Sequence, residues 1–160
     1  MALLKLSSIE VDTKAETDGE WVQIKEWTGL DPEKPFHVTK FEDEGIELKM
    51  LVRSTNCHSF KVARQKAGER LEEMKKDNPD GIPDELVDVE NGKLMAEHLL
   101  LGWSGFDVEY SPDAAVALLT KPSARIHRQM VMFCATRCGQ RKAEFLASEA
   151  DNLGKSPRGR

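Results

Sequence analysis

The chain has 160 residues, a mass of 18.0 kDa and a formal net charge of -5 at pH 7, a size that suits one domain with its own hydrophobic core. Its longest apolar runs, 99–101 and 130–134, are far shorter than the roughly 20 residues of a membrane span. Glu10 and Asp12 interrupt the start of the chain, where a signal peptide needs an apolar segment. We therefore expect a protein of the cytosol with no membrane partner.

The first part of the chain, residues 1–53, is predicted to be an N-terminal β region. Residues 1–20 have weak alternation followed by a polar stretch, so we expect an extended and partly mobile lead-in. Three later runs alternate apolar and polar residues with the period of two that strands require: 21–27, 36–41 and 46–53. They predict a small antiparallel sheet or hairpin.

The period then changes to 3.6, which predicts a helical region over residues 54–150 that packs on the β region as one domain. Four helices are expected, over about 57–77, 83–101, 111–121 and 123–150. Ser111-Pro112 is a strong start signal, because a hydroxyl cap precedes proline at the first helical position. Asn91-Gly92 conflicts with the second helix and predicts a kink there. The fold class is therefore α+β.

The last predicted helix runs to Ala150, and Gly139 is expected to loosen it or split it into two. Its buried residues are predicted from their helical spacing: Ile126, Met130, Phe133, Cys134, Ala143 and Leu146. Residues 151–160 are polar and rich in Lys, Arg, Gly and Pro. They predict a disordered basic tail.

Three cysteines, Cys57, Cys134 and Cys138, match no disulfide framework and are expected to be free thiols. Cys134, Cys138 and His127 share roughly one helix face, which raises the possibility of zinc. A zinc site, however, wants four ligands and usually a tight Cys-x2-4-Cys turn, which is missing. We predict no metal ligand and no cofactor.

No residue pattern indicates catalysis. Cys57 and His58 are neighbours in sequence, but neighbouring side chains at a helix start point in different directions. The chain also lacks a Gly-rich phosphate loop of the Gly-x4-Gly-Lys-Ser/Thr type. We therefore predict a protein that is not an enzyme and has no catalytic residues.

Charge is distributed unevenly, because residues 121–160 hold nine Lys/Arg and three Asp/Glu, whereas residues 1–120 hold 14 and 25. The basic part includes Arg125 and Arg128, which are candidates either for nucleic-acid phosphates or for acidic parts of another protein. Aromatic residues for base stacking are not interleaved with the basic residues. The pattern therefore favours a solvated face or a protein partner over nucleic acid.

The segment around Gly102-Trp103-Ser104-Gly105 joins two predicted helices and carries three aromatic residues, Trp103, Phe106 and Tyr110. They can form a plug over the helix ends, since aromatic side chains bury large areas, or they can anchor a partner. The candidate partner-binding residues are therefore Trp103, Phe106, Tyr110, Arg125 and Arg128.

Over roughly residues 46–147, the chain resembles the tail assembly chaperones of long-tailed, siphovirus-like bacteriophages. The resemblance rests on the Gly102-Trp103-Ser104-Gly105 element, the short loop after it, the aromatic-Ser-Pro-acid helix start at Tyr110-Ser111-Pro112-Asp113, and the paired Leu118-Leu119. It implies a non-enzymatic protein that oligomerises and binds the helical tape-measure protein, keeping it soluble until the tail tube forms.

The resemblance also implies a location in the cytoplasm of the bacterial host cell and absence from the mature virion. It implies a frameshifted longer form of the chain as a further partner. Two alternatives remain open: a structural virion protein, such as a head-tail connector or tail-completion protein, and a small nucleic-acid-binding regulator.

Overall fold

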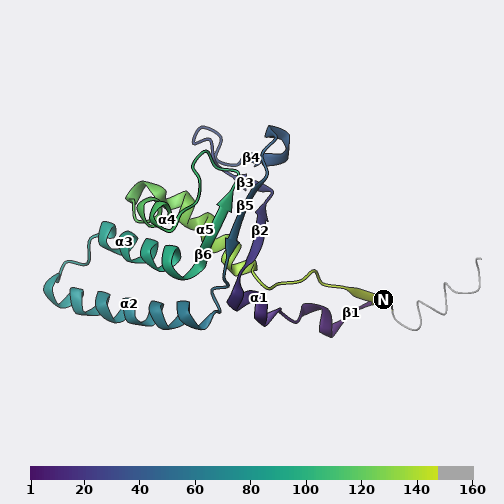
Figure 1. Ribbon diagram of the computed structural model, residues 1–160, viewed down its shortest axis with the longest axis horizontal. Coiled ribbons are helices and arrows are strands. Elements are labelled where there is room, and N and C mark those ends of the chain that lie inside the picture. The colour runs from purple at the N-terminus through teal and green to yellow at the C-terminus, as the bar shows by residue number, and fades with distance from the viewer. Residues whose placement is uncertain (148–160) are drawn as a thin grey trace, which may run out of the picture.

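The computed structural model describes residues 1–147 and contains one central three-stranded antiparallel sheet. Its strands are β2 (Glu20–Ile24), β5 (Leu48–Val52) and β6 (Leu100–Ser104), in the order β2-β5-β6. Helices gather on one side of this sheet (Figure 1). The predicted α+β class is confirmed.

One face of the sheet is the floor of the hydrophobic core. Along β5 the side chains alternate, so that Leu48, Met50 and Val52 are buried and the two between them are half-buried. Helix α5 (Arg125–Arg137) packs on β2 and β5 and adds Val131 to this core. On the opposite face Trp21 is 48% exposed, which is the pattern of an antiparallel sheet with one solvated side.

The other elements extend from this centre. Strands β3 (Glu26–Thr28) and β4 (Val38–Lys40) form a two-stranded sheet. Helices α2 (His58–Asp77) and α3 (Asp84–Leu94) form a hairpin that projects to one side (Figure 1). Helix α4 (Pro112–Leu119) begins as predicted, since the Ser111 hydroxyl accepts a hydrogen bond from Ala114 N at 3.0 Å.

The predicted second helix, 83–101, is too long. Helix α3 is followed by a π-helical turn, Met95–Leu99, and then by β6, whose residues pair with β5. The apolar run 99–101 fits both the helical and the strand period. It forms a strand because the edge of β5 offers backbone hydrogen-bond partners for it. Helix α3 continues through Gly92, where a Cβ would lie 2.0 Å from Leu119 O.

The predicted last helix, 123–150, is wrong beyond Arg137. Gly139 adopts a φ of 84°, and its carbonyl oxygen accepts a hydrogen bond from Asp12 N at 2.8 Å, so the chain turns away from the helix axis. Leu146 is therefore exposed rather than buried, and Ala143 is half-buried. Residues 148–150 of this prediction and the predicted tail 151–160 lie outside the described residues.

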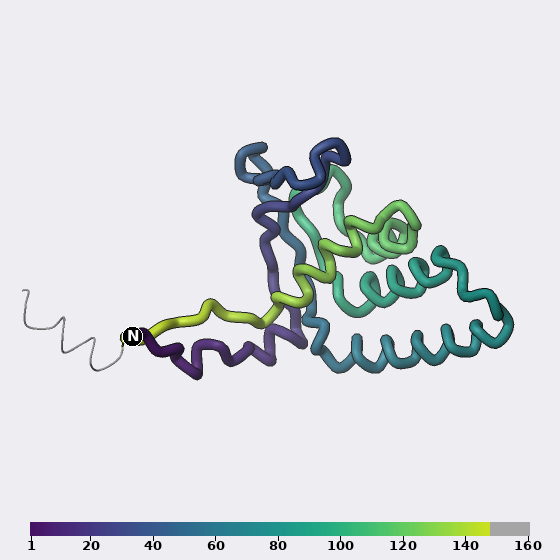
Figure 2. Tube along the Cα trace, turned by 180° about the vertical axis from the view of Figure 1, so that it is seen from behind, coloured from purple at the N-terminus to yellow at the C-terminus, as the bar shows by residue number. Residues whose placement is uncertain are grey.

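The expected extended lead-in over residues 1–20 is also corrected. It contains strand β1 (Ala2–Leu4), a 3-10 turn at Leu6–Ile9, and helix α1 (Thr13–Asp18), whose first turn is capped by the Asp12 carboxylate. Strand β1 pairs with β7 (Phe145–Ala147). We call residues 1–12 and 139–147 the terminal arm, and Figure 2 shows that it projects away from the body. This pairing joins segments about as far apart as the sequence allows.

Candidate partner-binding pocket

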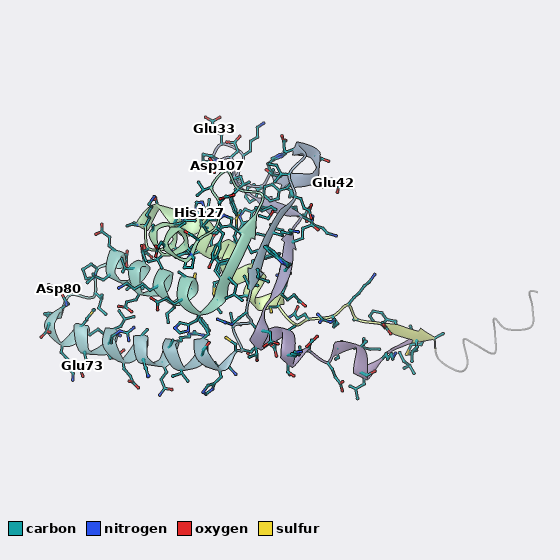
Figure 3. The ribbon with its side chains drawn as sticks, viewed as in Figure 1. Glu33, Glu42, Glu73, Asp80, Asp107 and His127 are labelled. Atoms are coloured by element: carbon teal, nitrogen blue, oxygen red, sulfur yellow. The ribbon has the colours of Figure 1, made fainter. Side chains whose placement is uncertain are left out.

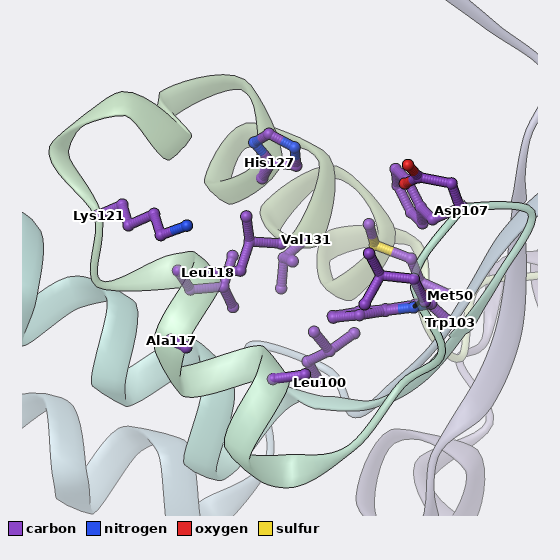
Figure 4. A pocket seen from close by; sticks show the side chains of 13 residues that line it. Met50, Leu100, Trp103, Asp107, Ala117, Leu118, Lys121, His127 and Val131 are labelled. Carbon is purple, nitrogen blue, oxygen red and sulfur yellow. Dashed lines mark hydrogen bonds between the residues drawn. The ribbon is translucent and has the colours of Figure 1, made fainter.

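An apolar pocket of about 310 Å³ lies between β6, the loop after it, α4 and α5 (Figure 4). Its lining combines the floor of the sheet with helical residues: Met50, Leu100, Trp103, Phe106, Asp107, Val108, Ala114, Ala117, Leu118, Leu119, Lys121, His127 and Val131. A cavity of this size and character accommodates a few apolar atoms of a partner rather than a large polar ligand.

The loop after β6, residues 105–110, which we call the aromatic loop, makes one wall of the pocket because it folds back on itself. Gly105 has a φ of 100°, and a Cβ there would lie 2.5 Å from Glu47 O, so glycine permits this turn. Trp103 Nε1 donates a hydrogen bond to Val108 O at 2.6 Å. The Trp103 ring meets Phe106 and Tyr110 edge-on, with centroids 5.9 and 5.2 Å apart.

The three aromatic residues singled out in the sequence therefore lie together. All three pack against the core, and the Tyr110 hydroxyl donates a hydrogen bond to Leu100 O at 3.3 Å. Trp103 and Phe106 also line the pocket. The same side chains thus close the end of the core and face an open apolar space, so the two roles weighed for them are compatible.

His127 gives the pocket a polar group. Its Nδ1 atom is buried and has no hydrogen-bond partner within residues 1–147. Burial lowers the pKa of His127, and the positive charges of Arg128 and Lys121 lower it further. The imidazole is therefore neutral at pH 7. Figure 4 shows His127, Lys121 and Asp107 around an apolar interior.

The two predicted arginines lie elsewhere. Arg128 is buried, and its guanidinium donates hydrogen bonds to the carbonyl oxygens of Leu119, Lys121 and Pro122, where α4 ends. It also lies 3.5 Å from the Asp88 carboxylate. Arg125 is exposed and lines a separate shallow hollow. Neither arginine side chain lines the apolar pocket.

Sequence reasoning missed His127 and Lys121 as pocket residues. His127 was considered only as a metal ligand, although it lies four residues before Val131 on one face of α5, a spacing that places both toward the same neighbour. Lys121 follows the paired leucines of α4. Its position in the turn after the helix gave no sign of its side chain returning to the pocket.

The three cysteines are buried and lie away from the pocket lining. Burial raises the pKa of Cys134 to about 12 and that of Cys138 to about 11, the latter with help from Glu20 and Glu16. The Cys138 thiol donates hydrogen bonds to Ala15 O and Val52 O, both at 3.3 Å. In the described part of the chain no three His, Cys, Asp or Glu side chains gather in a way that could hold a metal ion.

The family model of the YdaY prophage protein matches residues 55–155. The chain belongs to the YdaY prophage protein family. This prophage family segment begins just before α2 and includes β6, the aromatic loop, α4 and α5. It therefore contributes every pocket residue except Met50. No curated protein and no solved structure matched the chain. Within residues 1–147 no helix has the length and apolar character needed to cross a membrane.

Proposed function

We propose that this prophage protein is a non-enzymatic tail assembly chaperone that binds the phage tape-measure protein and keeps it soluble during tail assembly. The observation that carries this proposal is the open apolar pocket framed by Trp103, Leu118 and His127. Membership of a prophage family is consistent with this role. Trp103 of the Gly-Trp-x-Gly element and the paired Leu118 and Leu119, on which the resemblance to tail assembly chaperones rests, line the same pocket.

The physical task suits such a pocket. A long amphipathic helix exposes an apolar stripe along its length, and a groove or pocket on another protein can cover part of that stripe. Each Leu or Phe that enters the pocket stabilises the complex by roughly 1.5 to 3 kcal/mol before the cost of association. Many weakly bound copies along one helix would then add up to effective shielding.

Polar groups at the pocket orient the bound segment. The neutral His127 imidazole lines the pocket, so a partner hydroxyl or amide placed beside it meets a polar ring rather than an aliphatic side chain. Lys121 and Asp107 supply opposite charges around the apolar interior. We propose that these three residues select the position of the tape-measure helix, whereas the apolar lining provides the affinity.

The proposal is tested by co-expressing the chain with the tape-measure protein and measuring how much of the latter stays soluble. We expect the wild-type chain to keep it soluble and Leu118→Asp, which places a charge in the pocket, to lose this effect. Leu86→Asp is the matched control, because Leu86 is 42% exposed on α3 and is not a pocket residue. Equal loss of activity in both variants would remove the pocket from the proposal.

A chaperone acts in the host cytoplasm before the tail is complete. We therefore propose that the protein is absent from the mature virion, which mass spectrometry of purified particles tests directly. Detection of the chain as a stoichiometric virion component would favour the structural alternative, a connector or tail-completion protein.

A further inference from the structure

The terminal arm carries an unusual share of the exposed apolar surface. Among the described residues, fifteen large apolar side chains are exposed, and eight of them lie in the arm: Met1, Leu3, Leu4, Leu6, Ile9, Val11, Phe145 and Leu146. The arm projects from the body (Figures 1 and 2), and each of these side chains is at least 47% exposed. Exposed apolar patches of this kind usually mark an interaction surface.

The tip of the arm is apolar on both faces. Leu3 lies opposite Leu146, and Leu4 lies opposite Phe145. Directly opposite residues of an antiparallel pair share a face and successive residues alternate between faces, so each face carries one of these apolar pairs. A ribbon with a solvated side would carry polar residues there. Both faces of the tip therefore suit burial.

The edges of the arm are open as well. Within residues 1–147, β1 and β7 pair only with each other, so each has one edge of unpaired backbone groups. An isolated two-stranded ribbon is marginally stable in water, and an open edge is satisfied by another strand. A helical partner satisfies its own backbone groups internally, so a tape-measure helix does not meet this need. A second copy of this chain does.

Charge also permits two arms to meet. The arm holds three basic and three acidic residues, whereas residues 13–138 hold 17 basic and 23 acidic residues. Within the arm, Lys5 pairs with Glu144 at 3.3 Å and Arg141 pairs with Asp12 at 2.7 Å. Acidic residues of the body, such as Glu73 and Asp80, lie at the far end of the helical hairpin (Figure 3). Two acidic bodies repel each other, but two neutral arms do not.

The arm is large enough for a stable contact. Eight side chains exposed by about half or more present on the order of 800 Å² of surface, which is about what each partner contributes to a standard protein interface. Edge-to-edge pairing brings part of this surface into contact, because neighbouring strands place their side chains beside each other on each face. A two-fold arrangement suits this, because the same surface then serves on both copies.

We propose that the terminal arms of two copies pair with each other, strand edge to strand edge, to form a two-fold dimer whose bodies point apart. This inference rests on the proposed function only through the self-association that the resemblance to tail assembly chaperones implies, and it does not depend on binding of the tape-measure protein. The apolar pocket between β6, α4 and α5 lies away from the arm and stays available in both copies.

The first test measures the mass of the full chain in solution by light scattering. We expect the wild-type chain to have twice its monomer mass of 18.0 kDa, and Leu3→Asp and Leu146→Asp to have the single mass. Leu86→Asp is the control and should keep the doubled mass. A wild-type monomer, or an assembly that persists in both arm variants, would overturn the proposal. Because none of the eight arm side chains is buried within the chain, the variants should still fold, and their thermal stability should fall only by the contribution of the dimer.

The second test identifies which surfaces meet. All three native cysteines are buried, so a cysteine introduced on the surface is cross-linked selectively by a bismaleimide reagent. In a two-fold arm pair, residues near the axis meet their own counterparts, so Leu3→Cys or Leu146→Cys should give a covalent dimer in high yield. Leu86→Cys should not. Cross-linking at neither arm position would overturn the arm-to-arm arrangement.

The two proposals fail separately. A chain that is monomeric but still keeps the tape-measure protein soluble would remove the arm pairing and leave the chaperone function standing. A dimer joined through its arms that leaves the tape-measure protein insoluble would remove the chaperone function and leave the arm pairing standing.

Discussion

Gly92 in α3 lies directly against the carbonyl oxygen of Leu119 at the end of α4. A Cβ on Gly92 would lie 2.0 Å from that oxygen, which no real side chain allows. We therefore predict that Gly92→Ala destabilises the protein by about 1 to 3 kcal/mol, because overpacking outweighs the gain of roughly 1 kcal/mol in helix propensity. Chemical denaturation measures this change.

Gly68→Ala in α2 is the matched control. A Cβ there meets nothing within 4 Å, so alanine should stabilise the helix by up to about 1 kcal/mol. Opposite signs for the two glycines are the expected result. A stabilising effect at Gly92 would show that α3 and α4 do not cross as closely as described.

The period of apolar residues was sufficient for the elements that bury one clear face. The strand ending at Val52, the helix beginning at His58 and the cap at Ser111 all follow from local residues. The same reasoning failed where pairing with a segment distant in sequence determines the secondary structure. Leu100 becomes part of a strand because β5 has an open edge, and Leu146 leaves the last helix because residues near the N-terminus pair with the chain after Gly139.

In the candidate site, too, local sequence predicts some residues and tertiary packing determines the others. The three aromatic residues could be grouped from the sequence because they are close along the chain. His127 and Met50 join them only through the packing of α5 and the sheet. Arg128 looked like a surface charge, yet the carbonyl groups at the end of α4 need donors, and a buried arginine supplies them.

Arg128→Met tests this internal role. The substitution keeps much of the side-chain volume but leaves the carbonyl oxygens of Leu119 and Lys121 without their donors. Each carbonyl left without a donor costs about 1 to 3 kcal/mol, so we expect a total loss of about 2 to 6 kcal/mol in the free energy of unfolding. Arg125→Met, at an exposed position, should change it by less than about 0.5 kcal/mol. A neutral effect at Arg128 would contradict the capping role.

The thiols should be inert in the folded protein. A thiolate is the reactive form, and burial holds the pKa of Cys134 at about 12 and that of Cys138 at about 11. We expect a disulfide-exchange reagent at neutral pH to react with all three cysteines only as fast as the protein unfolds. Addition of denaturant should release three equivalents rapidly. Fast reaction of Cys138 without denaturant would show that its bonds to Ala15 O and Val52 O are transient.

The buried His127 makes stability depend on pH. Its pKa is lowered in the folded protein, so between that value and the ordinary value of about 6.5 the unfolded chain binds the proton and the folded chain does not. Protons therefore favour unfolding, and stability is lost as the pH falls below about 6.5. We expect His127→Gln to show a smaller drop in melting temperature between about pH 7.5 and about pH 5.5 than the wild type.

His37→Gln, which removes an exposed histidine, is the control for this comparison. If His127→Gln and the wild type lose the same melting temperature on acidification, the buried imidazole is not the group that titrates.

Trp103 separates the structural role of the aromatic loop from its binding role. Trp103→Ala removes the edge-on contacts with Phe106 and Tyr110 and the hydrogen bond to Val108 O. We expect a loss of about 3 kcal/mol in the free energy of unfolding, together with weaker tape-measure binding as the pocket wall collapses. Trp103→Phe keeps most of the apolar contact and should lose only about 1 kcal/mol for the missing hydrogen bond. Normal thermal stability of Trp103→Ala with abolished binding would instead make Trp103 a pure contact residue.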